Sequence, residues 1–270
     1  MTHLLFDLSG RVALVTGAAQ GMGRAMAIGF AESGADLLIC DINAEGVQNT
    51  AALIRGLGRR VRSVTCDITN IEQIRDMFAQ LDSEFGRIDI LGNVAGPSKL
   101  SMPEDLDLKD MEYVLHGLLI ARFCCCQEAG RRMLATGKGS IINISSIGGV
   151  TALGRGNFAY SVGMGGVAQM TRELSTEWSG RGVRVNAILP AQVRNPGLEE
   201  RMQVDPTLEE MFLRGIPIGR IGRPDDIKGL AIFLASDASA WITGAIIPMD
   251  GGNLAQNAGG TPGPRKTQVT

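Results

Sequence analysis

The sequence predicts an α/β protein, with a single doubly wound domain built on a mostly seven-stranded parallel sheet. Three observations support this prediction. Short apolar runs alternate with segments of helical spacing, a glycine-rich turn follows the first run, and no composition shift or internal repeat divides the chain. Continuous apolar strands joined by crossover helices are typical of a parallel sheet covered on both faces. Right-handed crossovers then produce the doubly wound arrangement.

The individual elements follow from hydrophobic spacing, with period two for strands and near four for helices. The expected strands are 12–16, 36–40, 61–66, 88–93, 140–145, 182–188 and 245–249. The expected helices are 22–33, 44–57, 71–85, 110–135, 158–181 and 225–235. We assign residues 1–252 to the domain and 194–216, which interrupt the alternation, to a substrate lid. Residues 253–270, rich in Gly, Pro, Asn and Thr, are expected to be a flexible C-terminal tail.

The glycine-rich turn lies between the first strand and the first helix. Its glycines are Gly17, Gly21 and Gly23, and Gln20 and Met22 lie among them. Such a turn lets a pyrophosphate approach backbone N–H groups at a helix N-terminus. We therefore expect all five residues to contact a dinucleotide, although glycines alone also fit a tight turn in any α/β protein.

An acidic residue at the end of the second strand narrows this prediction. Asp41 follows the apolar run 37–40. A carboxylate at this place can accept a hydrogen bond from the adenosine ribose of NAD and would repel the 2′-phosphate of NADP. The order of loop, helix, strand and acid therefore predicts an NAD site.

The bulk properties exclude several other classes. The chain has 270 residues, 44% hydrophobic residues and a formal net charge of −2, which favours neither nucleic acid nor an anionic membrane as partner. No apolar run reaches the roughly 18 residues of a membrane span, and residues 1–10 lack the features of a signal peptide. The five cysteines show no CxxC spacing. We expect reduced thiols, no metal site, a small-molecule substrate and a cytoplasmic location.

Several short motifs occur in the same order as in a known family. The motif-bearing residues are Thr16-Gly17-x-x-x-Gly21-x-Gly23, Asp41, Cys66-Asp67-Ile68, Asn93-Val94-Ala95-Gly96, Ile144-Ser145-Ser146, Tyr160, Val185–Pro190 and Asp250-Gly251-Gly252. From about residue 10 to 252 the chain resembles a short-chain dehydrogenase/reductase. The resemblance implies a Rossmann-type fold, a nicotinamide cofactor, and hydride transfer between an alcohol and a carbonyl.

The resemblance also implies roles for individual residues. It assigns the border of the adenine to Asp67 and Ile68. It assigns the cofactor contacts at the fourth strand to Asn93, Ala95 and Gly96, and the edge of the nicotinamide to Pro190 and Val193. Asn195 stands where the family often has a threonine for the carboxamide. Ser146 would hold the substrate oxygen, and Tyr160, which also belongs to the cofactor site, would exchange a proton with it.

Two places depart from the family pattern. Met164, four residues after Tyr160, stands where the family has a catalytic lysine, and Leu118 stands where a relay asparagine is usual. A thioether has neither charge nor donor. A free tyrosine has a pKa of about 10, so losing the lysine's help could cost roughly a thousandfold in rate. We infer that the relay is absent as a unit and predict a slow enzyme, an alkaline optimum or another proton carrier.

Three functional readings stay open, and Met164 could also be an introduced change. The first is an NAD-dependent oxidoreductase with an altered proton relay, and the second is an NAD(H)-binding protein with little or no turnover. The third is a family member adapted to non-redox chemistry, which ranks last because the glycine turn is intact.

Other polar residues are weighed against simpler roles. His116, on the long helix, could be an alternative base but is expected to be packed. Polar residues near the cleft loops could meet a substrate with hydroxyls or a carboxylate, or could simply be solvated; these are Arg155, Asn157, Gln192 and Arg194. Cys124, Cys125 and Cys126 lie in a helix that is apolar nearly all round, so we expect packing rather than redox chemistry. The resemblance implies a homo-tetramer, or a dimer, through this helix and the Tyr160 helix.

Overall fold

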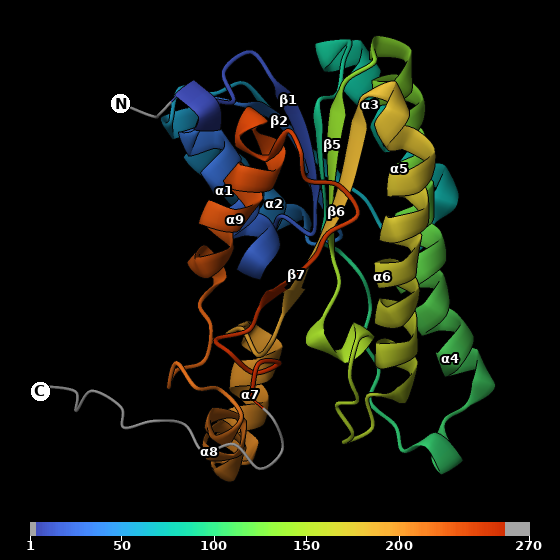
Figure 1. Cartoon of the computed structure of the whole chain (residues 1–270), viewed down its shortest axis with the longest axis vertical. Helices are drawn as coiled ribbons and strands as arrows, with labels where there is room; N and C mark the ends of the chain where they lie inside the picture. Colours follow the sequence, from blue (N-terminus) through green and yellow to red (C-terminus); the bar gives the residue numbers. More distant parts are fainter. Residues whose placement is uncertain (1–3, 257–270) are drawn as a thin grey trace, which may run out of the picture.

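The computed structural model describes residues 4–256, and a seven-stranded parallel sheet forms its centre (Figure 1). The strand order is β3-β2-β1-β4-β5-β6-β7. The strands are β1 (Val12–Thr16), β2 (Asp36–Asp41), β3 (Val61–Thr65), β4 (Ile90–Asn93), β5 (Gly139–Ile144), β6 (Val183–Pro190) and β7 (Ile246–Met249). The predicted doubly wound sheet is confirmed, and each expected strand agrees with an observed one to within two residues at either end.

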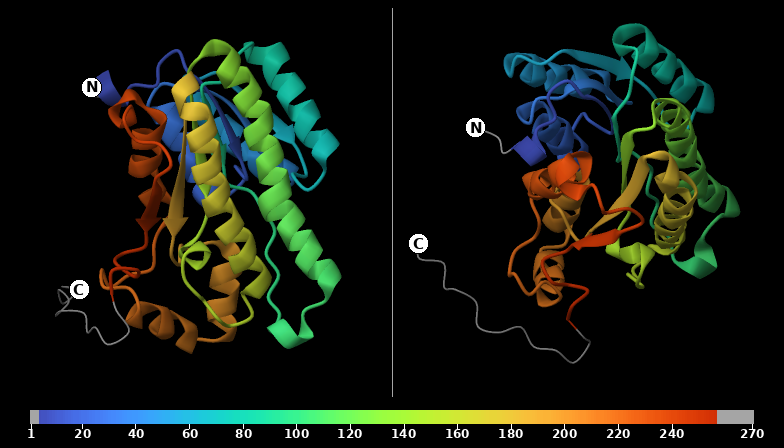
Figure 2. Two further views of the ribbon diagram at one scale, coloured as in Figure 1. Left: turned by 45° about the vertical axis from the view of Figure 1, so that its right-hand side comes forward. Right: turned by 45° about the horizontal axis from the view of Figure 1, so that its top comes forward.

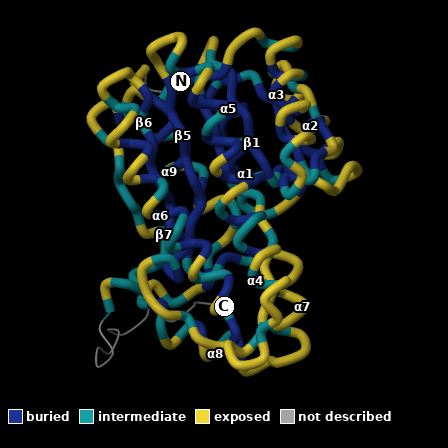
Figure 3. The backbone as a smooth tube through the Cα atoms, turned by 90° about the vertical axis from the view of Figure 1, so that its right-hand side faces the viewer, coloured by how far each residue is buried: buried dark blue, intermediate teal, exposed yellow. Residues whose placement is uncertain are grey.

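Helices cover both faces of this sheet (Figures 1 and 2). One face carries α1 (Gly21–Glu32), α2 (Ala44–Gly56) and α9 (Ile227–Ala235). The other carries α3 (Ile71–Phe85), α5 (Ala121–Thr136) and α6 (Phe158–Trp178). The central strands are deeply buried (Figure 3), and every residue of β1, β4 and β5 is buried. This continuous burial explains why these strands appear in the sequence as unbroken apolar runs.

The long helix predicted over 110–135 is divided. Helix α4 (Leu108–Leu115) leads into a π-helical turn (His116–Ile120), and α5 follows. Leu118 lies in this turn and is 1% exposed. A π turn changes the direction in which side chains leave a helix and is often found at functional sites. The sequence pattern did not indicate it, because this stretch is apolar on nearly all sides and hides the shift of phase that one extra residue causes.

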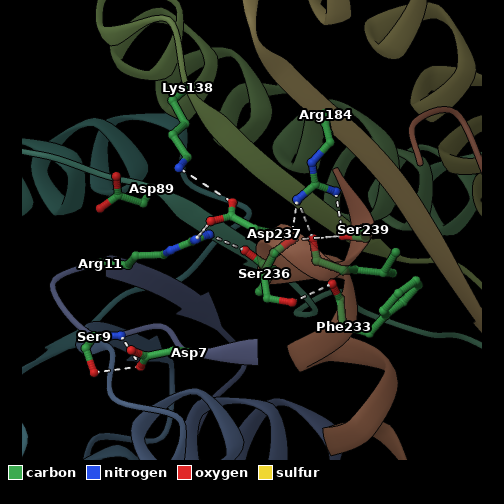
Figure 4. Close-up of polar contacts among 12 residues, drawn as sticks. Asp7, Ser9, Arg11, Asp89, Lys138, Arg184, Phe233, Ser236, Asp237 and Ser239 are labelled. Carbon is green, nitrogen blue, oxygen red and sulfur yellow. Dashed lines mark hydrogen bonds and ion pairs between the residues drawn. The ribbon is translucent and has the colours of Figure 1, made fainter. Parts of the chain in front are cut away.

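The two ends of the sheet have different roles. At the amino end, Arg11 and Arg184 donate to the carbonyl oxygens of Ala235 and Leu234, the last residues of α9 (Figure 4). Asp237 supplies the anion of this cluster and pairs with Arg11 at 2.6 Å. Cations at the C-terminus of a helix satisfy its free carbonyls and its dipole. The amino end is therefore a structural junction, while the loops at the carboxyl end are free to form a ligand site.

The predicted lid forms two helices below the carboxyl end of the sheet (Figure 1). These are α7 (Pro196–Val204) and α8 (Thr207–Arg214). The segment has a small core of its own, formed by Leu208, Phe212, Ile216 and Ile221 with Leu198, Met202 and Leu213 packed against it. Arg194 pairs with Glu209 at 2.6 Å, which fastens α8 to the loop after β6.

The expected C-terminal tail begins with an ordered turn. Leu254 donates its backbone N–H to Asp250 at 2.7 Å and packs beside Ile147 and Leu189. Residues 257–270, the rest of that expected tail, lie outside the described part of the chain. No helix within residues 4–256 combines the length and the hydrophobicity of a membrane span.

Candidate active site

The glycine turn opens onto a cavity of about 380 Å³ at the carboxyl ends of β1 to β4. Gly21 has a φ of +56°, which L-residues with side chains rarely adopt. At Gly23 a Cβ atom would overlap the carbonyl oxygen of Gly17. One glycine is thus required for backbone conformation and another for space, so the turn fits the close approach of a pyrophosphate.

Asp41 is held ready at the end of β2. One carboxylate oxygen accepts from the N–H of Ala19 and the other from the N–H of Asn43, both at 3.0 Å. The predicted cofactor residues that line this cavity are Gly17, Gln20, Gly21, Met22, Gly23, Asp41, Asp67, Ile68, Ala95, Gly96 and Asn195. We call this cavity the cofactor end of the cleft. Its bare backbone and fixed carboxylate fit the pyrophosphate and a ribose of a dinucleotide.

A second cavity, of about 540 Å³, continues from the first and contains Ser146 and Tyr160. Met22, Val94, Gly96 and Asn195 line both cavities. Pro190 and Val193 line the second, as expected for the nicotinamide edge. We call it the reacting end of the cleft. The two cavities form one elongated groove along the carboxyl end of the sheet.

Ser146 and Tyr160 are brought together from different elements. Ser146 follows β5, and its Oγ accepts from the N–H of Gly148 at 3.0 Å. This contact leaves the hydroxyl proton available for a ligand oxygen. Tyr160 lies in the first turn of α6, and its phenol oxygen forms no hydrogen bond with any residue in 4–256. The Ser146 hydroxyl can therefore donate to a ligand, and the Tyr160 hydroxyl is free to exchange a proton.

Met164 and Leu118 occupy the two departing places, and both are buried in one apolar cluster. Val114, Leu118, Ala159 and Met164 form its core, with Tyr160 packed against it. Met164 is 4% exposed, and its backbone oxygen accepts from Ser145 Oγ at 2.9 Å. Both places are therefore filled by apolar side chains of one packed cluster.

Arg122 is the functional candidate that the sequence reading missed. It lies in α5, is 2% exposed and lines the reacting end of the cleft. Burial lowers the pKa of its guanidinium to about 10, and the nearby Tyr160 acts in the opposite direction. The group remains charged at neutral pH and carries a folding penalty on the order of 3 kcal/mol. A single cation within the apolar run 114–126 was the available signal.

Asn93, predicted to line the cofactor, lies behind the cleft. Its amide donates to the backbone oxygen of Arg122 at 3.0 Å and to Asn143 Oδ1 at 3.2 Å. It is 1% exposed. The side chain therefore ties β4 to α5 and β5, and it is absent from the residues that line either cavity.

Asn195 caps the lid as well as lining the cleft. Its Oδ1 accepts from the N–H of Leu198, and its Nδ2 donates to the oxygen of Val193, both at 3.0 Å. One amide N–H is left for the predicted carboxamide contact. The residue joins the start of α7 to the reacting end.

The remaining candidates divide between the cleft and the scaffold. His116 Nε2 lies 2.8 Å from the oxygen of Thr69, so the ring is packed as expected. Asn157 and Gln192 line the reacting end, as does Arg201, which the sequence reading did not select. Arg155 lies over the ring of Phe212, 5.0 Å from its centroid.

The thiols of Cys124, Cys125 and Cys126 are free and buried, as predicted for packing. Burial raises the pKa of all three, that of Cys126 to about 12. A protonated, enclosed thiol is a poor nucleophile and a poor redox group.

The comparisons with known proteins agree with this architecture. A family model described as enoyl-(acyl carrier protein) reductase matches residues 17–253. D-threitol dehydrogenase of Mycolicibacterium smegmatis is 41% identical over 247 residues, which cover 92% of this chain and 94% of that protein. A short-chain type dehydrogenase/reductase from Mycobacterium marinum has a TM-score of 0.86 at 32% identity, with 92% and 97% of the two chains covered. A gluconate 5-dehydrogenase from Burkholderia cenocepacia in complex with NADP and tartrate has a TM-score of 0.87 at 30% identity, with 94% and 99% covered.

The chain therefore belongs to the short-chain dehydrogenase/reductase family. It is an oxidoreductase of the alcohol–carbonyl type with a site for a nicotinamide dinucleotide.

Proposed function

We propose that this protein is an NAD-dependent dehydrogenase that interconverts a secondary alcohol and a carbonyl on a small polyhydroxylated substrate, such as a sugar alcohol or sugar acid. The observation that supports this most is the shared groove: Ser146 and Tyr160 face a cavity that continues into the glycine turn. The named activities of D-threitol and gluconate relatives support the substrate class.

The groups at the reacting end suit a polar substrate. Asn157 and Gln192 offer amides, and Arg201 offers a charge with no ion-pair partner among residues 4–256. Partial burial, and after it the charge of Arg201, lower the pKa of Arg155, which indicates that the two cations lie close enough to repel each other. Arg155 lies outside the lining of the reacting end, and Arg201, which lines it, favours an anionic or hydroxyl-rich ligand there.

The preference for NAD rests on Asp41. Its carboxylate is fixed by two backbone N–H groups and lines the cofactor end. The next residue is Ile42, so no cation immediately follows to receive a 2′-phosphate. A fixed anion at this place favours a ribose hydroxyl over a phosphate ester.

The mechanism assigns separate tasks to the two hydroxyls. When bound, the nicotinamide ring supplies or accepts the hydride. Gly21 and Gly23 would hold the pyrophosphate and Asp41 the adenosine ribose. Ser146 donates to the substrate oxygen and holds it near Tyr160, because its bond with Gly148 leaves the hydroxyl proton free. Tyr160 gives its proton to that oxygen in reduction and takes it back in oxidation.

A dehydrogenase panel tests this proposal. Purified protein is mixed with NAD or NADP and with matched pairs of sugar alcohols and sugar acids, and reduced cofactor is followed by absorbance from pH 6 to 10. We expect turnover with NAD on at least one polyhydroxylated substrate. Absence of any turnover, with calorimetry showing no NAD or NADH binding, would refute the proposal.

A second candidate is an NAD(H)-binding protein with little or no turnover. The apolar cluster that contains Met164 and Leu118 favours this candidate. Neither side chain offers a charge or a hydrogen-bond donor where the family has a lysine and an asparagine. This candidate predicts cofactor binding by calorimetry without turnover on any substrate of the same panel.

We also propose a cytoplasmic homo-oligomer, a tetramer or a dimer, through α5 and α6. Phe123 of α5 and Phe158 and Val162 of α6 are 39%, 47% and 44% exposed in the single chain, which supports this assembly. Light scattering coupled to gel filtration measures the mass directly, and a monomer at micromolar concentration would contradict it.

A further inference from the structure

Arg122 is a buried cation without a matching anion. Its Nε donates to the oxygen of Ala95 at 2.9 Å, and its Nη2 donates to that of Val94 at 2.8 Å. Its Nη1 donates to the oxygen of Ile144. A guanidinium has five N–H groups, so two are left without a partner among residues 4–256. None of its partners in this part of the chain is a carboxylate.

Arg184 at the other end of the sheet is a useful contrast. It also donates to carbonyl oxygens, those of Leu234 and Ser236, but the carboxylate of Asp237 stabilises its charge (Figure 4). A buried charge is costly unless it is paired. The uncompensated charge of Arg122 therefore suggests a role that scaffolding alone does not require.

The guanidinium is built into the wall of the reacting end. The carbonyls that hold it belong to the carboxyl ends of β4 and β5, and its backbone is anchored by Asn93. A Cβ on Gly96 would lie 2.5 Å from Leu118 Cδ2 and 3.1 Å from Nη2, so the glycine leaves room for the guanidinium beside it. Tyr160 and Ser146 line the same cavity.

We propose that Arg122 is the cation of this active site and stabilises the negative charge that Tyr160 and the bound substrate oxygen carry during proton exchange. The proposal rests on the proposed function of the same cleft. The proton passes between the phenol and the substrate oxygen, and Arg122 keeps all its protons because its guanidinium stays charged throughout. It supplies, from α5, a positive charge where Met164 and Leu118 supply none.

The first test uses the protein without cofactor or substrate. The chain has two tyrosines, Tyr113 and Tyr160, so in a Tyr113→Phe background the tyrosinate absorbance belongs to Tyr160 alone. We expect adding Arg122→Met to move the midpoint of that absorbance upward by about one pH unit, and Arg122→Lys to move it less. An unchanged midpoint in a folded Arg122→Met protein would overturn the proposal.

The titratable groups near the guanidinium allow the absorbance change to be assigned to Tyr160. They are Tyr160 from α6 and Cys125 and Cys126 from its own helix. Burial raises the pKa of both thiols, and thiolates absorb at shorter wavelengths than tyrosinate. The signal therefore reports the phenol.

The second test moves the positive charge from position 122 to position 164. Arg122→Met is expected to lower kcat/KM at pH 7 by about tenfold and to shift the pH–rate profile to higher pH. Combining Arg122→Met with Met164→Lys is expected to recover most of that loss, because the cation returns to the same cavity. A purely structural clamp would not be rescued in this way, so a double variant as slow as Arg122→Met with unchanged pH profiles would contradict the proposal.

A matched control and the wild type separate the possible failures. Arg184→Met removes a similar carbonyl-bonded arginine from the amino end and is expected to lower thermal stability without moving the pH profile. If wild-type protein binds no cofactor and shows no turnover, the proposed function fails, while the tyrosinate titration still decides the role of Arg122.

Discussion

The two ends of the cleft differ in how closely they follow the family pattern. At the cofactor end, the glycine turn and Asp41 are in the expected places and geometry. At the reacting end, Ser146 and Tyr160 face the cavity, but Met164 and Leu118 are packed into an apolar cluster, and Arg122 lies in the wall beside them. The difference teaches that binding and proton transfer can change separately. In the proposal made for Arg122, the groove keeps its nucleotide geometry while the charge near its phenol comes from another helix.

The largest effect should come from removing the phenol at the reacting end. Tyr160→Phe deletes the proton carrier and keeps the ring, so kcat/KM should fall by about 10²- to 10⁴-fold. NADH affinity by calorimetry should change by less than about tenfold, the range of one lost hydrogen bond. An active Tyr160→Phe enzyme would show that the proton travels through another group.

A change at the cofactor end should act in the opposite sense. Gly23→Ala places a Cβ on the carbonyl of Gly17 and should raise the Kd for NADH by about 100-fold, because the turn must open. The matched control is Gly229→Ala in α9, where nothing lies within 4 Å of the new Cβ. It should leave affinity unchanged and add about 0.5–1 kcal/mol of stability. Equal affinities for both variants would contradict this account of the turn.

A smaller effect is expected from the carboxylate that selects the cofactor. Asp41→Asn should weaken NAD binding by about tenfold and strengthen NADP binding, because the charge that repels the 2′-phosphate is gone. Calorimetry with both cofactors measures the ratio. Asp36→Asn, at the other end of the same strand, is the control. The prediction does not survive if the NAD/NADP ratio stays the same in Asp41→Asn.

The smallest effect lies outside the cleft. Hydrogen bonds from Arg220, and a backbone N–H from Arg223, lower the pKa of Asp226. A carboxyl whose folded pKa is depressed contributes stability above its unfolded pKa, and that contribution is lost as pH falls through the folded value. Arg220→Met should therefore cost less than about 1 kcal/mol at pH 7, with little difference from wild type below about pH 3. Urea unfolding at both pH values checks this, and a larger loss in acid would contradict it.

Much of the fold could be predicted because its elements have local causes. The buried strand Val12–Thr16, the turn at Gly17–Gly23 and Asp41 follow from spacing that the chain shows directly. The two apolar residues Met164 and Leu118 could also be recognised in the sequence, because the motifs of the family define both places.

Other features depend on contacts that spacing does not show. Residues 110–135 are helical, as predicted, but the π turn around Leu118 was not predicted from the apolar stretch in which it lies. Asn93 was expected at the cofactor because of its motif, but its amide is used to join strands to α5. Arg122 was passed over because the carbonyls that accept its hydrogen bonds belong to residues 22 to 28 positions away in the chain.

The small separate core of the lid has a consequence for how substrates enter. Because Leu208, Phe212 and Ile216 pack mainly within their own segment, α7 and α8 are expected to swing as one rigid body, with a hinge near Arg194 and Asn195. Substrate entry would then depend on a lid that moves without unfolding. Its backbone amide protons would therefore stay protected from solvent exchange as it opens and closes.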